Sequence, residues 1–597
     1  MNSKHRSPAP QFRRHPIARQ LLQMRWALLT AAWLPLAALA NPTDGVVVGG
    51  DANAIITTGA ITTIEQFSQT AIINWSQFNV DSGEQVIFDQ PSASAAVLNR
   101  VTGGIGSEIF GTISGNGRVF LVNPNGVLIG STGQIDVQGL VISTLGISDA
   151  DFRRGTYRFT AAPVSSSPSP KVENEGRIQI RPGGFVVLAG DTVVNAGAIT
   201  VPELVDGETG ILLQTGEVLM ASGGRLSLML DPEGLVSYDI TAAASASSGG
   251  VSTLSESSIN APAGDVYLSG FANSGTMAAA VNHDGDVSAR TIQENNGVIL
   301  LEGQAGDVIS TGDLDASADN GNGGTVYVLS DATIHVSSRI DASGSSGGGD
   351  IRIGSSDSDL PTSSLSDNQI TTAANITLES FANLTANTAP SGSEFARLFS
   401  GRTGTIALTA ITRIDLTDTT INGDLVRLVA PIISNFSSSS ESSPPTSYIN
   451  GSQIRIQGEE ISLADTSFYI QPNGSSFNDR LNFGFFNTGI ARALYPDDLT
   501  PDLVLDATSS LSYFSIDGAA NYIVLRAPLA FVADFGSVFG SANLFLQYTP
   551  AAVDNASNFD FELPLLGFAN NARSFGFGGS RYGGDVFIGP PGTTPLG

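Results

Sequence analysis

The sequence predicts an all-β protein, and specifically a right-handed parallel β-helix, a solenoid in which short strands stack coil upon coil. Three observations predict this fold. The 597-residue chain has 67 glycines and 28 prolines but only 14% charged residues, which disfavours long helices. From residue 41 onward, short runs of β-forming residues alternate with Gly, Asn, Asp and Ser. A recurrent unit also appears, in which Gly, often followed by Asp or Thr, precedes alternating β-formers.

The copies of this unit are spaced like the coils of a solenoid. Two Asp-Ala-Ser segments, which start at Asp315 and Asp341, repeat at a similar interval, and each precedes a Gly-rich link. One coil cannot bury its own apolar face, so neighbouring coils must stack. A β-sandwich, the main alternative, needs antiparallel hairpins with tight two-residue loops, and few such loops occur. The copies begin at Gly224, Gly264, Gly297, Gly324, Gly349, Ala374, Gly404 and Gly423.

The strongest turn signal lies within the stretch Arg118–Gly130. Two apolar runs, residues 119–122 and 127–129, flank the tetrapeptide Asn-Pro-Asn-Gly at positions 123–126. Its proline presets the second position of a turn, and the first asparagine can accept a bond from its own backbone two residues on. Because the runs do not alternate polar and apolar residues, we expect both to be largely buried. The plainer interpretation is an ordinary β-turn of a β protein.

The first 40 residues have the pattern of a signal peptide with an extended basic segment. An apolar run from Trp26 to Ala38 follows the basic segment, and Ala38-Leu39-Ala40 is a small-x-small cleavage site. We therefore expect cleavage between Ala40 and Asn41, and no membrane span in the mature chain. The basic residues are Lys4, Arg6, Arg13, Arg14, Arg19 and Arg25, with no acidic residue among the first 25.

Composition also limits the partners of the mature chain. Removing the six basic residues of the predicted signal peptide takes the formal net charge from −28 to −34. Such a charge disfavours nucleic acid and anionic membrane surfaces as main partners. The chain has no cysteine, so disulfides and thiolate metal sites are unavailable. We expect a cysteine-free chain to suit export in an unfolded state, because no disulfide can lock it early.

Segments around the central turn resemble a known secretion domain. In order they are residues 74–81, 86–103 and 139–144, together with the Asn-Pro-Asn-Gly turn. The combination resembles the secretion domain of filamentous-haemagglutinin-like proteins of bacterial two-partner secretion, over roughly residues 41–240. The resemblance implies a capped N-terminal domain on the β-helix and export through a partner outer-membrane transporter with POTRA-type periplasmic domains. It places the secretion signal at Asn74, Trp75, Phe78, Asn79, Asn99, Arg100, Asn123, Pro124, Asn125 and Gly126.

The mature chain contains no pattern that demands catalysis. His283 lies in a predicted turn and His335 in a predicted strand, and neither has a second histidine at metal-ligand spacing. Residues 344–348 match Gly-x-Ser-x-Gly, but they form a Ser/Gly-rich link before a strand, whereas an esterase elbow joins a strand to a helix. We therefore expect no catalytic residues, no metal site and no cofactor.

These observations divide the chain into a signal peptide at 1–40, a secretion domain at 41–245, β-helical repeats at 246–436, a Ser/Pro-rich loop at 437–447 and a C-terminal β-rich region at 448–597. The expected function is that of a secreted or surface-exposed adhesin or haemagglutinin-like exoprotein, with an unidentified receptor or glycan. A cytolysin, a contact-dependent toxin and a polysaccharide-acting β-helix enzyme are the alternatives.

Overall fold

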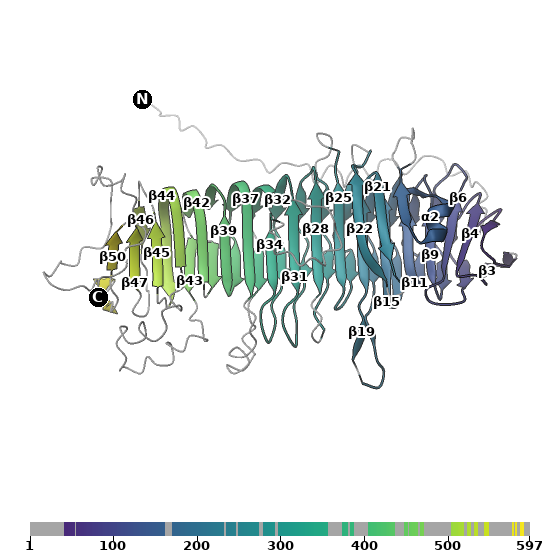
Figure 1. Ribbon diagram of the computed structural model, residues 1–597, viewed down its shortest axis with the longest axis horizontal. Coiled ribbons are helices and arrows are strands. Elements are labelled where there is room, and N and C mark those ends of the chain that lie inside the picture. Colours follow the sequence, from purple (N-terminus) through teal and green to yellow (C-terminus); the bar gives the residue numbers. More distant parts are fainter. Residues whose placement is uncertain are drawn as a thin grey trace, which may run out of the picture. The chain divides into compact units, whose positions relative to one another are not determined.

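The chain separates into two compact units, Met1–Ala40 and Asn41–Gly597, and all described residues belong to the second. The predicted signal peptide, including Ala38 and Ala40, therefore lies outside the described residues. Side chains are described as far as residue 450, with Ile454 and Ile456 beyond it. The computed structural model (Figure 1) describes residues 41–53, 55–161, 170–209, 211–231, 234–245, 249–273, 279–292, 297–355, 373–379, 382–386, 404–435, 447–451, 453–463, 466–470, 503–518, 522–526, 531–534, 543–547, 576–577, 580–581 and 586–589.

The second unit is a parallel β-helix, as the sequence predicts. Its strands form three ladders of parallel pairs, here called face 1, face 2 and face 3, and each coil contributes about one strand to each face. Several long strands turn a corner and serve two faces. Figure 1 shows the strands of successive coils side by side.

Face 1 begins at the N-terminal end and continues to the last described strand. From β4 onward its pairing is parallel. The strands are β4 (Thr70–Trp75), β6 (Ala96–Val101), β9 (Arg118–Val122), β11 (Gln134–Ser143), β15 (Arg177–Gly190), β20 (Glu217–Ser222), β25 (Asp265–Phe271), β28 (Val298–Gln304), β31 (Thr325–Ser330), β34 (Asp350–Ile353), β37 (Thr405–Leu416), β39 (Leu425–Val429), β42 (Gln453–Leu463), β44 (Leu503–Gly518), β45 (Tyr522–Arg526), β47 (Asn543–Gln547) and β50 (Val586–Gly589).

Face 2 follows face 1 in each coil, and its strands are short. The later parts of β37, β42 and β44 also belong to it. Its other strands are β7 (Ser107–Ile109), β10 (Val127–Ile129), β14 (Lys171–Asn174), β16 (Thr192–Asn195), β23 (Gly250–Thr253), β26 (Val281–His283), β29 (Val308–Ser310), β32 (Thr333–Val336), β35 (Ala373–Leu378), β40 (Ile432–Asn435) and β46 (Phe531–Asp534).

Face 3 completes each coil. The early parts of β11 and β15 and the end of β44 contribute to it. Its other strands are β3 (Ile61–Glu65), β5 (Gln85–Asp89), β8 (Thr112–Gly115), β17 (Ala198–Thr200), β24 (Ser258–Asn260), β27 (Asp286–Ser288), β30 (Leu314–Asp315), β33 (Arg339–Asp341), β36 (Asn383–Ala386), β38 (Thr420–Gly423), β41 (Ser447–Gly451) and β43 (Thr466–Ile470).

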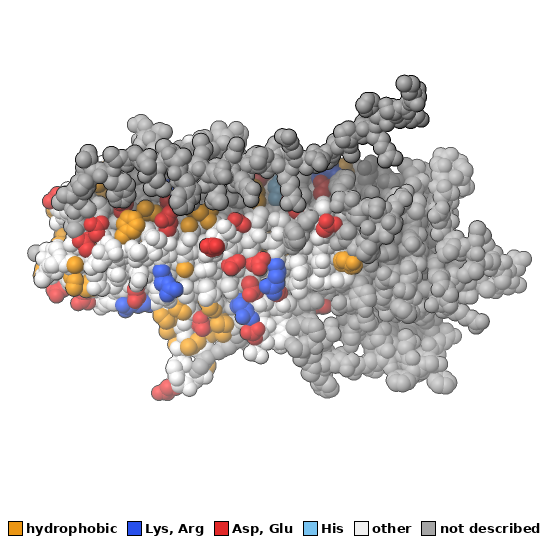
Figure 2. Space-filling model, turned by 180° about the vertical axis from the view of Figure 1, so that it is seen from behind, with side chains coloured by type: hydrophobic (Ala, Val, Ile, Leu, Met, Phe, Trp, Pro, Cys, Tyr) orange, Lys and Arg blue, Asp and Glu red, His pale blue; other side chains and the backbone are white. Residues whose placement is uncertain are grey.

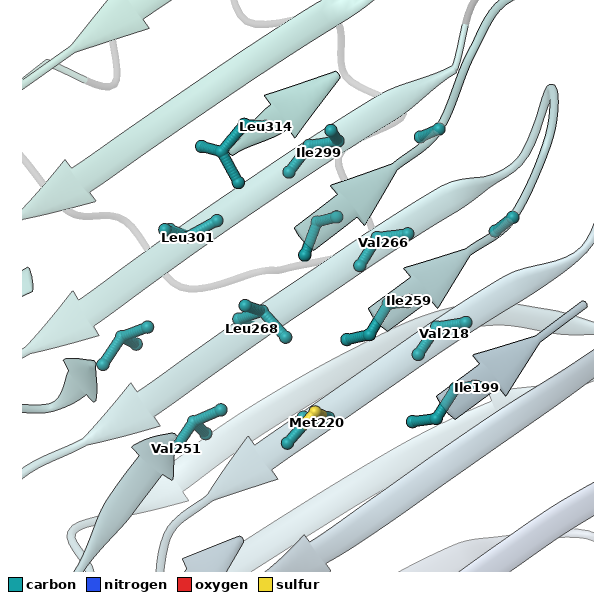
Figure 3. Close-up of a cluster of buried hydrophobic side chains, with 14 of the residues drawn as sticks. Ile199, Val218, Met220, Val251, Ile259, Val266, Leu268, Ile299, Leu301 and Leu314 are labelled. Atoms are coloured by element: carbon teal, nitrogen blue, oxygen red, sulfur yellow. The ribbon is translucent and has the colours of Figure 1, made fainter. Parts of the chain in front are cut away.

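The main core lies inside the coils and consists of stacked aliphatic side chains. Val218 pairs in register with Val266, which pairs with Ile299 in the next coil, and these three side chains lie in one row (Figure 3). A parallel row holds Met220, Leu268 and Leu301. All six side chains are fully buried. Each inward residue therefore packs on its equivalents above and below, which is how a coil too small for its own core becomes stable.

The N-terminal end is capped, as the resemblance implies. Strand β1 (Val46–Gly49) pairs antiparallel with β4 on face 1, and β2 (Ile56–Thr58) pairs antiparallel with β3 on face 3. The cap reverses the strand direction that all later coils share. It ends the parallel stack on this side, although the side chains of Val46, Ile56 and Phe67 remain exposed.

A second apolar layer, absent from the predictions, lies outside face 1. It is a four-stranded antiparallel sheet, here called the outer sheet, made of β12 (Gly146–Ile147), β13 (Tyr157–Thr160), β21 (Arg225–Leu230) and β22 (Leu235–Ala242). Helix α2 (Asp149–Arg154) precedes β13. The Oγ atom of Ser148 accepts a hydrogen bond from the backbone N–H of Asp151, which caps the helix at its N-terminus.

The outer sheet packs on the outward side chains of face 1 and forms a second core. Phe120 of β9 stacks on Tyr157 with ring centroids 5.2 Å apart and meets the edge of Phe152 at the same distance. Face 1 is therefore buried on both sides here, which explains why all five residues of β9 are buried. The lack of alternation in residues 119–122 was a sign of this layer in the sequence.

Two copies of the Gly-led unit do not lead into strands of face 1. The copy at Gly224 leads into β21, which belongs to the outer sheet, and the coil strand is the preceding β20. The copy at Ala374 leads into β35, which stacks on β32 in face 2. The next face 1 strand after β34 is instead β37. Alternating β-formers occur on all faces, so spacing alone could not assign the face.

The other copies from Gly264 to Gly423 behave as predicted. Strands β25, β28, β31 and β34 pair consecutively in face 1, and β37 and β39 continue that ladder. The two Asp-Ala-Ser segments stack in register, with Asp315 paired to Asp341 on face 3.

A hairpin of two short strands projects from the coils. Strands β18 (Leu204–Val205) and β19 (Leu212–Gln214) form a separate antiparallel hairpin between face 3 and face 1 (Figure 1). Its exposed side chains include Ile211 and Leu213, which are 57% and 60% exposed. Figure 2 shows hydrophobic side chains gathered at this projection with acidic ones beside them. A second small hairpin joins β48 (Gly576–Phe577) and β49 (Ser580–Arg581). Within the described residues, no helix has the length and apolar character to span a membrane.

Candidate secretion-signal region

The residues that the resemblance assigns to the secretion signal come together at one corner of the solenoid. They lie at or next to β4, β6 and β9, which stack consecutively in face 1, and in the segments that lead from face 1 towards face 2. Residues far apart in sequence therefore become neighbours, such as Asn74 and Arg100 in β4 and β6. We call this group of ten residues the signal corner.

The Asn-Pro-Asn-Gly tetrapeptide forms the corner of its coil. Strands β9 and β10 on either side of it do not pair with each other, because each pairs with neighbouring coils. The backbone N–H of Gly126 donates to the carbonyl of Asn123 at 3.1 Å, which closes the turn. The Oδ1 atom of Asn123 accepts from the backbone N–H of Asn125 at 2.9 Å, as predicted.

Asn123 also ties this coil to the preceding one. Its side chain is fully buried, and its Nδ2 atom donates to the carbonyl of Ile105 and to Ser107 Oγ, both at 3.0 Å. Asn125 is exposed but donates from Nδ2 to the carbonyl of Gly103 at 2.9 Å. The two asparagines thus hold adjacent corners together by side-chain bonds where the strand ladders are interrupted.

Gly126 satisfies a steric requirement of the same corner. Its φ is +109°, a backbone conformation that side chains with a Cβ rarely adopt. A Cβ atom there would lie 3.2 Å from the carbonyl oxygen of Lys171 in the following coil. Both the backbone angle and the close approach of the next coil therefore require glycine.

Trp75, Phe78 and Asn99 of the signal corner are also buried. The rings of Trp75 and Phe78 meet edge to face with centroids 5.4 Å apart, and both side chains are 1% exposed. The indole Nε1–H donates to Asn99 Oδ1 at 3.0 Å, and Asn99 Nδ2 donates to the carbonyl of Phe120 at 3.2 Å. These bonds connect β4, β6 and β9 in sequence.

Arg100 links the signal corner to the outer sheet. Its guanidinium forms an ion pair with Asp149 of α2 at 2.7 Å and donates to the carbonyl of Ile147 at 2.9 Å. It also donates to Asn74 Oδ1 at 3.3 Å. Asn79 accepts a bond from the backbone N–H of Glu108 at 2.9 Å. Nearly every predicted signal residue thus has a structural partner in the folded chain.

The expected cleavage site ends in a residue that is well anchored. Asn41 is 7% exposed, and its backbone N–H donates to Glu84 Oε2 at 2.9 Å. The boundary between the two compact units falls between Ala40 and Asn41. Cleavage at that bond stays a prediction.

An acidic cluster under the outer sheet is a feature that sequence reasoning missed. Glu217 of β20 and Asp265 of β25 are in register on face 1. Burial, with a smaller contribution from Asp265, raises the pKa of Glu217 to about 9. Burial also raises the pKa of Asp265 to about 6, although a bond from the hydroxyl of Tyr267 opposes the shift. Two carboxyls 48 positions apart give no local sequence signal.

The side chains considered for chemistry do not assemble into a reactive group. His283 is the last residue of β26, fully buried, and Thr253 Oγ1 lies 2.8 Å from its Nδ1. The prediction of a turn at residues 282–285 was wrong for this histidine, because β26 continues through His283 and only residues 284 and 285 separate it from β27. His335 lies in β32, as predicted, 3.8 Å from Glu379. In the described part of the chain, no three His, Cys, Asp or Glu side chains are grouped to hold a metal ion.

The Gly-x-Ser-x-Gly match belongs to a stacked corner of the coils. Residues 344–348 lie between β33 and β34, and Gly344 and Gly347 form bridges to Ala318 and Asn322 of the preceding coil. A strand-to-helix elbow is not formed at these residues, which agrees with the structural interpretation of the motif.

Comparison with known proteins identifies the N-terminal half of the solenoid. A family model described as the TPS secretion domain matches residues 40–316. The crystal structure of the HMW1 secretion domain from Haemophilus influenzae is 25% identical, with a TM-score of 0.50, and the match covers 72% of this chain and 100% of that chain.

Two curated relatives match part of the chain. A Heme/hemopexin-binding protein of Haemophilus influenzae (strain ATCC 51907 / DSM 11121 / KW20 / Rd) is 29% identical over 267 residues, which are 44% of this chain and 27% of that protein. A second Heme/hemopexin-binding protein of Haemophilus influenzae is 39% identical over 104 residues, 17% of this chain and 11% of that protein. The chain thus spans about a quarter or less of the length of these relatives. Residues 40–316, which contain the cap, the signal corner and the outer sheet, are a TPS secretion domain of the two-partner secretion exoproteins.

Proposed function

We propose that this chain is an exoprotein that is exported through the periplasm and a partner outer-membrane transporter with POTRA-type domains, and that the signal corner is its export address. The observation that carries the proposal is the position of that corner, in the first coils of a TPS secretion domain that directly follows a predicted signal peptide. The domain type supports both the partner and the final location, secreted or at the cell surface.

The burial of the signal corner restricts when recognition can occur. Asn123, Trp75 and Asn99 are inaccessible once the coils have stacked. The transporter must therefore read them in the unfolded chain, for example by pairing with it as an added strand. Stacking outside the cell then withdraws these residues from the transporter and favours outward movement, since each new coil buries apolar surface on the previous one.

Asn123→Ala tests this role, and Asn195→Ala is a matched control. Both asparagines are fully buried and hydrogen-bonded between coils, since Asn195 Oδ1 accepts from Asn174 Nδ2 at 2.8 Å, but Asn195 lies outside the signal corner. Each substitution should cost about 1–3 kcal/mol of folding free energy. The measurement is the amount of each variant in the medium and in the periplasm of cells that carry the transporter.

A recognition role requires that Asn123→Ala reduces export several-fold while Asn195→Ala, at a similar melting temperature, does not. Equal export of both variants would reject the signal assignment and leave the turn a purely structural role.

We infer further that the exported solenoid acts as an adhesin or haemagglutinin-like factor and has no enzymatic activity. Three features support this. The ladders continue beyond residue 316, the chain is strongly acidic, and the hairpin of β18 and β19 presents exposed apolar side chains beside Glu203 and Glu208. Exposed apolar groups on a projecting element commonly mark protein contacts.

The hairpin gives a direct test of adhesion. Leu213→Ser should reduce binding of the purified protein to target cells, whereas Ile411→Ser should not. The two side chains are equally exposed, at 60%, but Ile411 lies in β37, outside the hairpin and the secretion domain. Haemolysis and polysaccharide cleavage by the same preparation would favour the toxin or enzyme alternatives. Binding of heme or hemopexin would favour the activity for which the curated relatives are named.

A further inference from the structure

Glu84 forms a small acceptor site on the N-terminal cap that lacks a positive partner. Its Oε2 atom accepts from the backbone N–H groups of Asp81 and Asn41, at 2.8 and 2.9 Å, and its Oε1 atom accepts from Asn41 Nδ2 at 3.3 Å. None of the ion pairs among the described residues includes Glu84. The Glu84 carboxylate is half-buried and has only neutral donors, and it would bind a cation more strongly than it binds these donors.

Asn41 is positioned to supply that cation. Its backbone nitrogen already points at the carboxylate, and its Oδ1 atom accepts from the hydroxyl of Thr62, a fully buried residue of β3. Asn41 is therefore held by β3 and by the turn that precedes β5. If the bond to Ala40 is cut, this same nitrogen becomes a primary ammonium with three donors.

The backbone of Asn41 also favours the cut state. Its φ is +69°, in the left-handed region, where a residue other than glycine pays a conformational penalty. The angle exists only while a carbonyl carbon precedes the nitrogen. An N-terminal residue has no such carbonyl, so the penalty disappears on cleavage while the contacts to Glu84 and Thr62 can remain.

We propose that Glu84 is the binding site for the processed N-terminus, so that removal of the signal peptide completes the cap through an ion pair between the Asn41 ammonium and the Glu84 carboxylate. The proposal rests on the predicted cleavage. In that step a signal peptidase adds water across the Ala40–Asn41 amide. The hydroxyl goes to the Ala40 carbonyl carbon, and the proton of the resulting acid, with the second proton of water, goes to the Asn41 nitrogen. The cap of the first coils is thereby stabilised only in the processed chain.

A double-mutant cycle on the whole mature chain tests this pair. Four proteins are compared, which begin either at Asn41 or at a retained Ala40 and carry either Glu84 or Glu84→Gln. The readout is amide hydrogen exchange of β3 and β5, the strands that Asn41 connects. In the chain that begins at Asn41, Glu84→Gln should speed exchange about tenfold, and in the chain that retains Ala40 its effect should be several times smaller.

Glu65→Gln serves as the control, because Glu65 lies on the same cap but bonds to Asn53 at 3.0 Å. Its effect should not depend on the N-terminus. An equal effect of Glu84→Gln in both chains would overturn the proposal. The mass of the secreted protein tests the cleavage separately. An N-terminus other than Asn41 would reject the processing step, whatever the exchange data show of the ion pair.

Discussion

At the scale of single residues, two ionisable side chains move the stability of the fold in opposite directions with pH. Glu217 lies beneath the outer sheet, where burial raises its pKa from 4.5 to about 9. His283 lies inside a coil, where burial lowers its pKa from 6.5 to about 4. Both are held in their neutral forms near pH 7, which is the form that burial favours for each.

Glu217→Gln should stabilise the protein at neutral and alkaline pH. An acid whose pKa is raised by folding costs no stability below its ordinary pKa of 4.5, and the cost grows until the group ionises in the folded state near pH 9. We expect a gain of about 1–3 kcal/mol at pH 8 and almost none at pH 4.5. Denaturant unfolding at the two pH values measures the difference. A gain that is equal at both would contradict the burial of an ionisable Glu217.

His283→Asn should make the fold more tolerant of acid. A histidine whose pKa is lowered by folding contributes stability above its ordinary pKa of 6.5, and this is lost as pH falls towards 4. Asparagine occupies the equivalent ladder position in β14 and β16, at Asn174 and Asn195, so it suits the site. Between pH 6 and 4 the unfolding free energy of the natural chain should fall more steeply than that of the variant. The difference in slope should be up to about 1.4 kcal/mol per pH unit. Thermal unfolding of both proteins across that range is the measurement.

At the scale of elements, the outer sheet turns face 1 of the secretion domain into a strand layer with two apolar sides. Its strands come from two separate insertions, residues 146–160 and 225–242, that meet through the pairing of β13 with β21. Phe159 of β13 is fully buried between the sheet and the coils, whereas its neighbour Arg158 is exposed. The insertions are therefore joined by backbone pairing, and buried side chains such as Phe159 pack the sheet on the coils.

Phe159→Ala should loosen the outer sheet without melting the solenoid. Loss of a buried phenylalanine costs about 3–5 kcal/mol, and the coils retain their own separate core. Limited proteolysis should then cut within β21 or β22, while the far-ultraviolet circular dichroism of the coils stays unchanged. Arg158→Ala on the same strand is the control and should resist cleavage. Cooperative loss of all strand signal in the phenylalanine variant would show that the two layers fold as one unit.

At the scale of the whole solenoid, stability comes from repeated contacts between neighbouring coils. Strands β25, β28 and β31 pair in one register on face 1, and β26, β29 and β32 repeat the pattern on face 2. A complete coil is thus an exchangeable unit, provided that the inward residues keep their order.

Deletion of residues 298–324, one complete coil, should leave a folded and exported protein. Thr325 then follows Gly297 directly, and β31 can pair with β25 as β28 does in the natural chain. Deletion of residues 298–311, about half a coil, removes β28 and β29 but not β30, so the following strands change face. We expect normal circular dichroism and secretion for the first variant and aggregation or loss of export for the second. Equal behaviour of the two deletions would contradict a solenoid with fixed faces.

Local features of this protein could be predicted from the sequence. The Asn-Pro-Asn-Gly turn, the strands beside it and the glycine-led strands of successive coils depend on residues close together in the chain. These residues therefore determine the local structure themselves, as Gly126 does by adopting a positive φ. The family resemblance added the cap, which β1 and β2 form, and the secretion domain, which the comparison over residues 40–316 confirms.

Only the tertiary structure decided which strand belongs to which face and what lies against it. The strand after Ala374 was grouped with the other copies of the repeat unit, but it lies on face 2, and alternating residues look alike on all three faces. Three features join residues far apart in sequence. They are the outer sheet, the pairing of Glu217 with Asp265 and the hydrogen bond from Asn41 to Glu84. Such contacts depend on the number of residues in each corner. Because the corners differ in length, the repeat has no constant period, and strand register could not be predicted from the sequence.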